Sequence, residues 1–211
     1  MDPIFTGLPV ALAAVVVFWL YRRERKKRRQ QLIDEFRFPP SIAVKLTEKY
    51  PQLSEQDVEY VFCGLREYFH LCNLAGKRMV SMPSQVVDVA WHEFILFTRK
   101  YEYFCGKALG RFLHHTPAEA MRTPTDAQQG LKLAWKLSCQ REGMAPKAAN
   151  RLPLLFAIDQ QLNIDDGFKY ALDCKKTSGD YYCAGHIGCG GGCGGGGDSD
   201  SSGCGGGCGG D

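Results

Sequence analysis

A central segment of the chain gathers side chains that could bind a metal ion. The segment VVDVAWHEFILFTRKYEYFCGKALGRFLHH, residues 86–115, contains Asp88, His92, Cys105, His114 and His115. Asp88 and His92 lie four residues apart in a predicted helix and therefore share one face of it. If the next predicted helix folds back as a hairpin, Cys105 and one of the two later histidines reach the same place. Carboxylate, imidazole and thiolate groups then form a tetrahedral ligand set for zinc or a similar divalent ion.

Two other interpretations of this segment stay open. In the first, Asp88 makes local hydrogen bonds and His92 is a core histidine beside Trp91. In the second, Cys105 is a nucleophile activated by His92 or His114, as in cysteine acyl-transfer enzymes. Such an enzyme also needs an oxyanion hole and a group that orients the base, and the sequence indicates neither.

The C-terminal segment, residues 183–211, consists mostly of glycine and holds five cysteines. Its first eleven residues, CAGHIGCGGGC, contain Cys183, His186, Cys189 and Cys193, which is a possible Cys₃His zinc set. Soft thiolates would equally suit Cu(I) or an iron–sulfur cluster. The alternative is a disordered low-complexity tail with free thiols, because glycine loses the most entropy on ordering.

The N-terminal segment resembles a membrane anchor. Residues 4–21 carry no charge, and as a helix they would measure about 27 Å, which is close to the thickness of a bilayer core. Seven bases and one acid follow at residues 22–29. The pattern predicts a single transmembrane helix over residues 1–21 and a basic juxtamembrane helix over 22–35. The N-terminus would lie outside, the rest in the cytoplasm, and anionic lipid headgroups would be a partner.

Charge and cysteine content narrow the possible functions. The net charge is +3, but the basic run alone carries +6, so the remainder is slightly acidic. An acidic body is not expected to bind nucleic acid. Ten cysteines in a reducing cytoplasm are expected to be packing residues, metal ligands or reactive thiols rather than disulfides.

The body of the chain, residues 36–182, is predicted to be a compact all-α domain. Apolar residues recur at helical spacing, and Ser54 with Asp57 and Ser84 resemble helix caps. An extended piece is expected near residues 167–174. The predicted helices cover residues 41–50, 55–72, 85–97, 99–109, 125–142 and 152–162.

The central segment resembles the signature of the glycine-rich domain-containing protein-like family. That signature is close to V-D-x-x-W-H-x-H, followed by a tyrosine, a cysteine, a glycine and one or two histidines. The resemblance extends over residues 83–173 and implies a shared polar site, although the second histidine of W-H-x-H is Phe94 here. The matching residues are Val87, Asp88, Trp91, His92, Tyr101, Cys105, Gly110, His114 and His115.

These observations favour a membrane-tethered helical binding module whose thiol-rich tail captures a metal ion or a partner protein. The sequence favours binding over catalysis and indicates zinc as the ion. The alternative is a metal-dependent or thiol enzyme with its site at Asp88, His92, Cys105 and His114 or His115. A catalytic zinc would need an open coordination position for water.

Overall fold

The computed structural model describes residues 3–115, 124–172, 182–183 and 187, and this part of the chain is mostly helical. The all-α prediction for the body is thereby confirmed. The helices are α1 (Pro3–Glu35), α2 (Pro40–Lys49), α3 (Glu55–Ala75), α4 (Gln85–Leu96), α5 (Thr98–Phe104), the π-helix η1 (Cys105–Leu109), α6 (Pro124–Arg141) and α7 (Leu154–Gln161).

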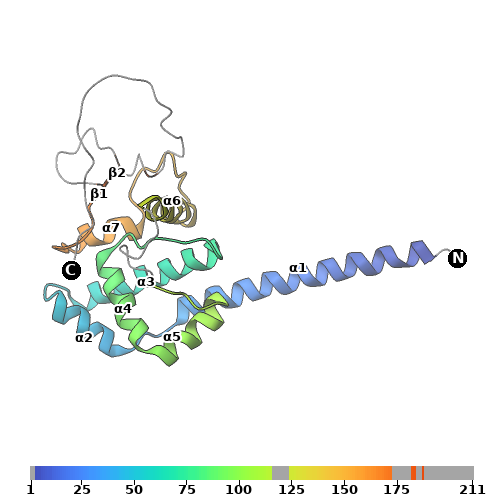
Figure 1. Ribbon diagram of the computed structural model, residues 1–211, viewed down its shortest axis with the longest axis horizontal. Coiled ribbons are helices and arrows are strands. Elements are labelled where there is room, and N and C mark those ends of the chain that lie inside the picture. The colour runs from blue at the N-terminus through green and yellow to red at the C-terminus, as the bar shows by residue number, and fades with distance from the viewer. Residues whose placement is uncertain (1–2, 116–123, 173–181, 184–186, 188–211) are drawn as a thin grey trace, which may run out of the picture.

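Helix α3 forms the centre of the body and packs against α1, α2, α4, α6, α7 and η1 (Figure 1). Apolar residues three and four positions apart give α3 a continuous buried stripe, as expected for a central helix. Its members include Val61, Leu65, Phe69 and Cys72, all of which are buried. The contact of α3 with α4 is the most extensive of these. Helix α4 carries Asp88 and His92 of the central segment.

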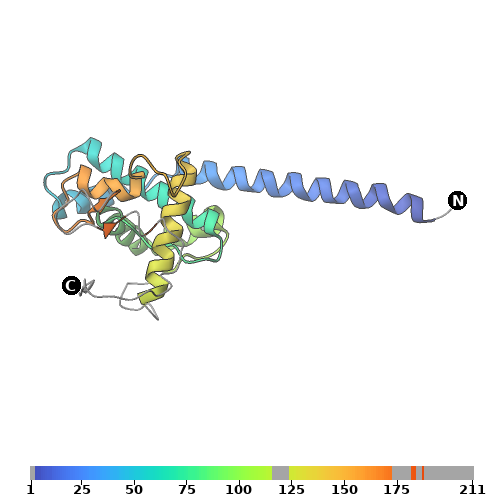
Figure 2. The same cartoon turned by 90° about the horizontal axis from the view of Figure 1, so that it is seen from above.

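Helix α1 projects from the body as a long rod (Figures 1 and 2). Its C-terminal end packs against the body, with Ile33 fully buried, whereas the apolar residues between Leu12 and Tyr21 are exposed. The apolar segment and the basic run form one continuous helix, α1. Among the described residues, no helix combines the length and the apolar character needed to cross a membrane. This finding corrects the predicted transmembrane anchor over residues 1–21 and the single-pass membrane location derived from it.

The predicted caps of two helices are confirmed. Before α3, the Ser54 hydroxyl accepts a hydrogen bond from the Asp57 backbone N–H, and the Asp57 carboxylate accepts one from the Ser54 N–H. Before α4, the Ser84 hydroxyl accepts a hydrogen bond from the Val87 N–H at 3.3 Å. These caps fix where α3 and α4 begin.

The helix predicted over residues 99–109 changes its winding part of the way along. It is α-helical to Phe104 and then forms η1, which closes with a bond from the Gly110 N–H to the Cys105 carbonyl at 2.9 Å. Gly110 adopts a left-handed conformation (φ 70°), and a Cβ there would lie 1.9 Å from Nη2 of Arg29. A glycine therefore permits both the turn and the close approach of α1. After this turn the chain runs back toward α4.

The extended piece expected near residues 167–174 is a short strand, β1 (Tyr170–Ala171). It pairs in parallel with β2 (Tyr182–Cys183), with Tyr170 opposite Tyr182 and Ala171 opposite Cys183. The tail from residue 188 onward lies outside the described residues, and so do His186, Cys189 and Cys193 of the proposed Cys₃His set.

Candidate metal centre

The outer face of α4 contributes two of the candidate ligands. Asp88 and His92 lie one helical turn apart, and Nδ1 of His92 is 3.7 Å from Oδ2 of Asp88. The Ser84 cap sets the start of this helix and thereby the direction in which both side chains point. Asp88 and His92 therefore share one face of α4, as their i, i+4 spacing predicted.

His115 joins this pair from the segment that follows η1. Its Nε2 is 3.4 Å from Oδ1 of Asp88 and 2.9 Å from Nε2 of His92. One potential ligand atom from each of the three residues lies within 4.8 Å of the other two. Two imidazoles and one carboxylate therefore each place a potential ligand atom in the same small volume.

The cluster is open to solvent on one side. The side chain of His92 is 50% exposed, whereas those of Asp88 and His115 are 22% and 18% exposed. Partial burial lowers the pKa of His92, and the nearby Asp88 carboxylate opposes this by raising it. The net lowering favours the neutral imidazole, which is the form that ligates metals.

Cys105 and His114 do not join the cluster. Cys105 is completely buried behind it, where burial raises the pKa of the thiol, and it forms a hydrogen bond with the Leu113 backbone. His114 is exposed and lies against the ring of Phe112, with 4.8 Å between the ring centroids. Of the two adjacent histidines, the structure therefore brings His115 to the candidate site.

Phe94 does not mark a lost ligand. It lies two residues after His92 and is completely buried, so it points to the opposite side of α4 from the cluster. Its ring contacts those of Phe36 and Phe104 at centroid distances of 5.3 and 5.5 Å. A histidine at this position of α4 would enter the aromatic core instead of reaching Asp88.

A buried acid, Asp159 of α7, was not among the residues predicted from the sequence. Its carboxylate accepts hydrogen bonds from the Ser84 hydroxyl at 2.6 Å and from the backbone N–H groups of Gln85, Val86 and Phe168 at 2.7–3.2 Å. Burial raises the pKa of Asp159, while these four bonds act in the opposite direction. The available signal was a single acid directly after the apolar run LLFAI. Asp159 anchors the start of the helix that carries the cluster.

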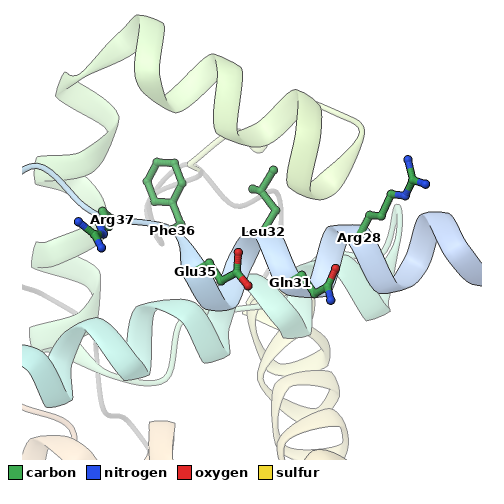
Figure 3. A pocket seen from close by; sticks show the side chains of 6 residues that line it. All are labelled: Arg28, Gln31, Leu32, Glu35, Phe36 and Arg37. Atoms are coloured by element: carbon green, nitrogen blue, oxygen red, sulfur yellow. The ribbon is translucent and has the colours of Figure 1, made fainter.

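A second feature, an open hollow of about 430 Å³, lies near the end of α1 (Figure 3). At this hollow, the side chain of Phe36 points toward α5, where its ring contacts that of Phe104. Its lining residues do not include any member of the Asp88–His92–His115 cluster. They are Arg28, Gln31, Leu32, Glu35, Phe36 and Arg37.

Comparison with known proteins places the chain in a family. The model of the UCP032817-like family matches residues 28–187, which is well over half of the chain and includes the whole cluster. No curated protein and no solved structure matches the chain. The predicted membership of the glycine-rich domain-containing protein-like family is therefore wrong, because the family model that matches, over the whole body, is that of the UCP032817-like family. The chain belongs to the UCP032817-like family.

Proposed function

We propose that the helical body binds one divalent transition-metal ion, with zinc as the expected ion, through Asp88, His92 and His115. The observation that carries the proposal is the convergence of their three potential ligand atoms within 4.8 Å of one another. These residues come from α4 and from a segment more than twenty residues later, so the convergence is a product of the fold and not of local sequence.

The spacing of the ligand atoms supports the proposal. Bonds of about 2.0–2.1 Å to a tetrahedral zinc ion place its ligand atoms about 3.3 Å apart. In the structure, one such atom from each of Asp88, His92 and His115 lies within 4.8 Å of the other two. Side-chain rotations that bring these atoms closer together would admit an ion. Histidine nitrogens and a carboxylate oxygen are also the ligands that zinc accepts in proteins.

The number of ligands indicates what kind of site this would be. Structural zinc sites are usually closed by four protein ligands, whereas catalytic sites keep three and leave one position for water or substrate. Three residues meet here, and the exposed side of His92 leaves room for an exogenous ligand. The second candidate function is thus a metal-dependent enzyme in which the ion activates a bound water.

The thiol-enzyme alternative has less support. A nucleophilic cysteine needs an accessible thiolate with a lowered pKa. Cys105 is completely buried, its pKa is raised by that burial, and it lies outside the three-residue cluster.

The test is metal binding by the full chain and by two adjacent histidine variants. Cobalt(II) is the probe, because its visible spectrum reports ligand type and geometry. We expect the wild-type chain to bind cobalt. Loss of a residue that only supports a ligand typically weakens metal binding by about 10–100-fold, and the loss in His115→Ala should be larger because it removes a ligand itself. His114→Ala is the matched control and should bind like the wild type, since His114 is exposed and outside the cluster.

The tail cysteines could also bind the probe, and the spectrum distinguishes the two sites. A nitrogen–oxygen site lacks the thiolate-to-cobalt charge-transfer band that a Cys₃His site would produce. Binding that shows only this thiolate band, and that survives His115→Ala, would contradict the proposed centre and favour the tail. A chain that binds no cobalt would contradict it as well.

A further inference from the structure

We propose that Tyr101 is the positioning residue of this metal centre: its hydroxyl holds the backbone of Leu113 so that His115 meets Asp88 and His92. This inference rests on the proposed metal binding. It concerns how the third ligand is kept in place, which the ligand cluster itself does not explain.

The contact between Tyr101 and Leu113 is short and buried. The Tyr101 hydroxyl donates to the Leu113 carbonyl at 2.6 Å and accepts from Nε1 of Trp91 at 3.1 Å. The side chains of Tyr101 and Trp91 are 1% and 3% exposed. In such a dry environment, a carbonyl or an indole N–H that loses its partner cannot turn to water instead.

The segment that carries His115 depends on these bonds. Residues 112–115 form neither helix nor strand, so no regular backbone ladder places them. The Tyr101 hydroxyl holds the Leu113 backbone through a hydrogen bond to its carbonyl. Since His115 follows only two residues later, the place of Leu113 decides where its imidazole lies.

Trp91 connects this arrangement to the helix that carries the other ligands. It lies on α4 between Asp88 and His92 but points inward, toward Tyr101. Its ring also packs edge-on against the His115 imidazole, with 4.7 Å between the centroids. One helix therefore supplies two ligands on its outer face and supports the third from its inner face.

The chemistry of Tyr101 suits a permanent donor. Burial raises the pKa of its hydroxyl well above the ordinary value, which favours the protonated form that donates to the Leu113 carbonyl. Supporting groups of this kind typically change metal affinity by about 10–100-fold when removed.

The test compares Tyr101→Phe with Tyr68→Phe in the full chain. Both substitutions keep a buried ring and remove a hydroxyl that donates to a backbone carbonyl twelve residues away, Leu113 in one case and Val80 in the other. Tyr68 is 2% exposed, so Tyr68→Phe is the matched control for losing a buried hydroxyl, although Tyr101→Phe also leaves the Trp91 indole N–H without its partner. Cobalt affinity and the cobalt spectrum are then measured for each.

We expect Tyr101→Phe to weaken cobalt binding by about 10–100-fold and to alter the spectrum, and Tyr68→Phe to leave both unchanged. Unchanged affinity and spectrum in Tyr101→Phe, with the wild type binding normally, would overturn the positioning role while the metal site stands. Equal losses of cobalt affinity in both variants would mean that the loss reflects general destabilisation, and would also overturn the positioning role. If the wild-type chain binds no cobalt, the proposed metal site itself is contradicted.

If Tyr101→Phe does not fold, Trp91→Phe provides the second test. It removes the indole donor to Tyr101 and leaves the Tyr101–Leu113 bond in place. We then expect a weaker but measurable loss of cobalt affinity. Wild-type affinity in this variant would contradict the role of the Trp91–Tyr101–Leu113 contacts.

Discussion

The carboxylate of Asp159 accepts a hydrogen bond of 2.6 Å from the hydroxyl of Ser84, 75 residues earlier in the chain. Through this bond and two more to backbone N–H groups, α7 holds the first turn of α4. A carboxylate at a helix N-terminus is favourable because the free N–H groups and the helix dipole both point toward it.

We therefore expect Asp159→Ala to lower the free energy of unfolding by about 3 kcal/mol or more, because it leaves several buried donors without a partner. Urea denaturation measures this loss. Asp165→Ala is the control, since Asp165 is exposed, and should change the value by less than about 0.5 kcal/mol. Equal effects in the two variants would mean that Asp159 does not anchor α4.

A glycine at the junction of three helices provides a second prediction. A Cβ on Gly64 of α3 would lie 2.8 Å from Cγ2 of Val87 and 3.2 Å from Cδ1 of Ile158. Gly64→Ala should therefore lower the free energy of unfolding by about 1–3 kcal/mol through overpacking. Gly106→Ala is the matched control, because a Cβ there meets nothing within 4 Å and its φ is not positive. It should be neutral or stabilise by up to about 1 kcal/mol.

The four cysteines of the body that the structure describes should differ in their reaction with iodoacetamide. Cys63 is exposed, whereas Cys72, Cys105 and Cys139 are buried. Burial raises the pKa of Cys72 to about 12 and that of Cys139 to about 11. In the folded chain at about pH 8, Cys63 should be alkylated and the three buried thiols protected, because the thiolate is the reactive form.

Mass spectrometry of the digested protein reads each of these sites separately, and the urea-unfolded chain is the control in which all four should react. Rapid labelling of Cys105 in the folded chain would contradict this prediction. It would also restore the thiol-enzyme alternative.

The Ser54–Asp57 cap predicts a pH dependence of stability. Hydrogen bonds from the Ser54 hydroxyl and N–H lower the pKa of Asp57 below its ordinary value of 3.8. A carboxyl group whose pKa is lowered by folding stabilises the folded state above its unfolded pKa, and this contribution disappears as the pH falls through the folded pKa. Ser54→Ala should therefore be destabilising near neutral pH, and its difference from the wild type should shrink below pH 3.8.

Urea denaturation of both proteins across this pH range measures the difference. The matched variant is Ser41→Ala, because Ser41 is an exposed serine near the start of α2, whose N-cap makes no side-chain hydrogen bond. A Ser54→Ala difference that stays constant down to strongly acidic pH would contradict the cap.

Much of the local structure could be predicted from the sequence because its causes are local. Helical periodicity located α3, α4 and α7 within a few residues, and the Ser54 and Ser84 caps followed from residue types at fixed spacing. The pairing of Asp88 with His92 needed only the pitch of one helix. The N-terminal apolar run was the exception, since its composition predicted a membrane-spanning helix, whereas among the described residues no helix has the length and apolar character to cross a membrane.

The amino-acid order by itself thus determined the helices and the first two candidate ligands, whereas only the tertiary structure decided the third. His114 and His115 are adjacent in a segment without regular structure, so no periodicity distinguishes them. The choice of His115, and the exclusion of Cys105, follow from how η1 and Gly110 turn the chain and from the bond of Tyr101 to Leu113. The physical reason is that helix pitch acts over a few residues, whereas these contacts exist only once distant helices have packed.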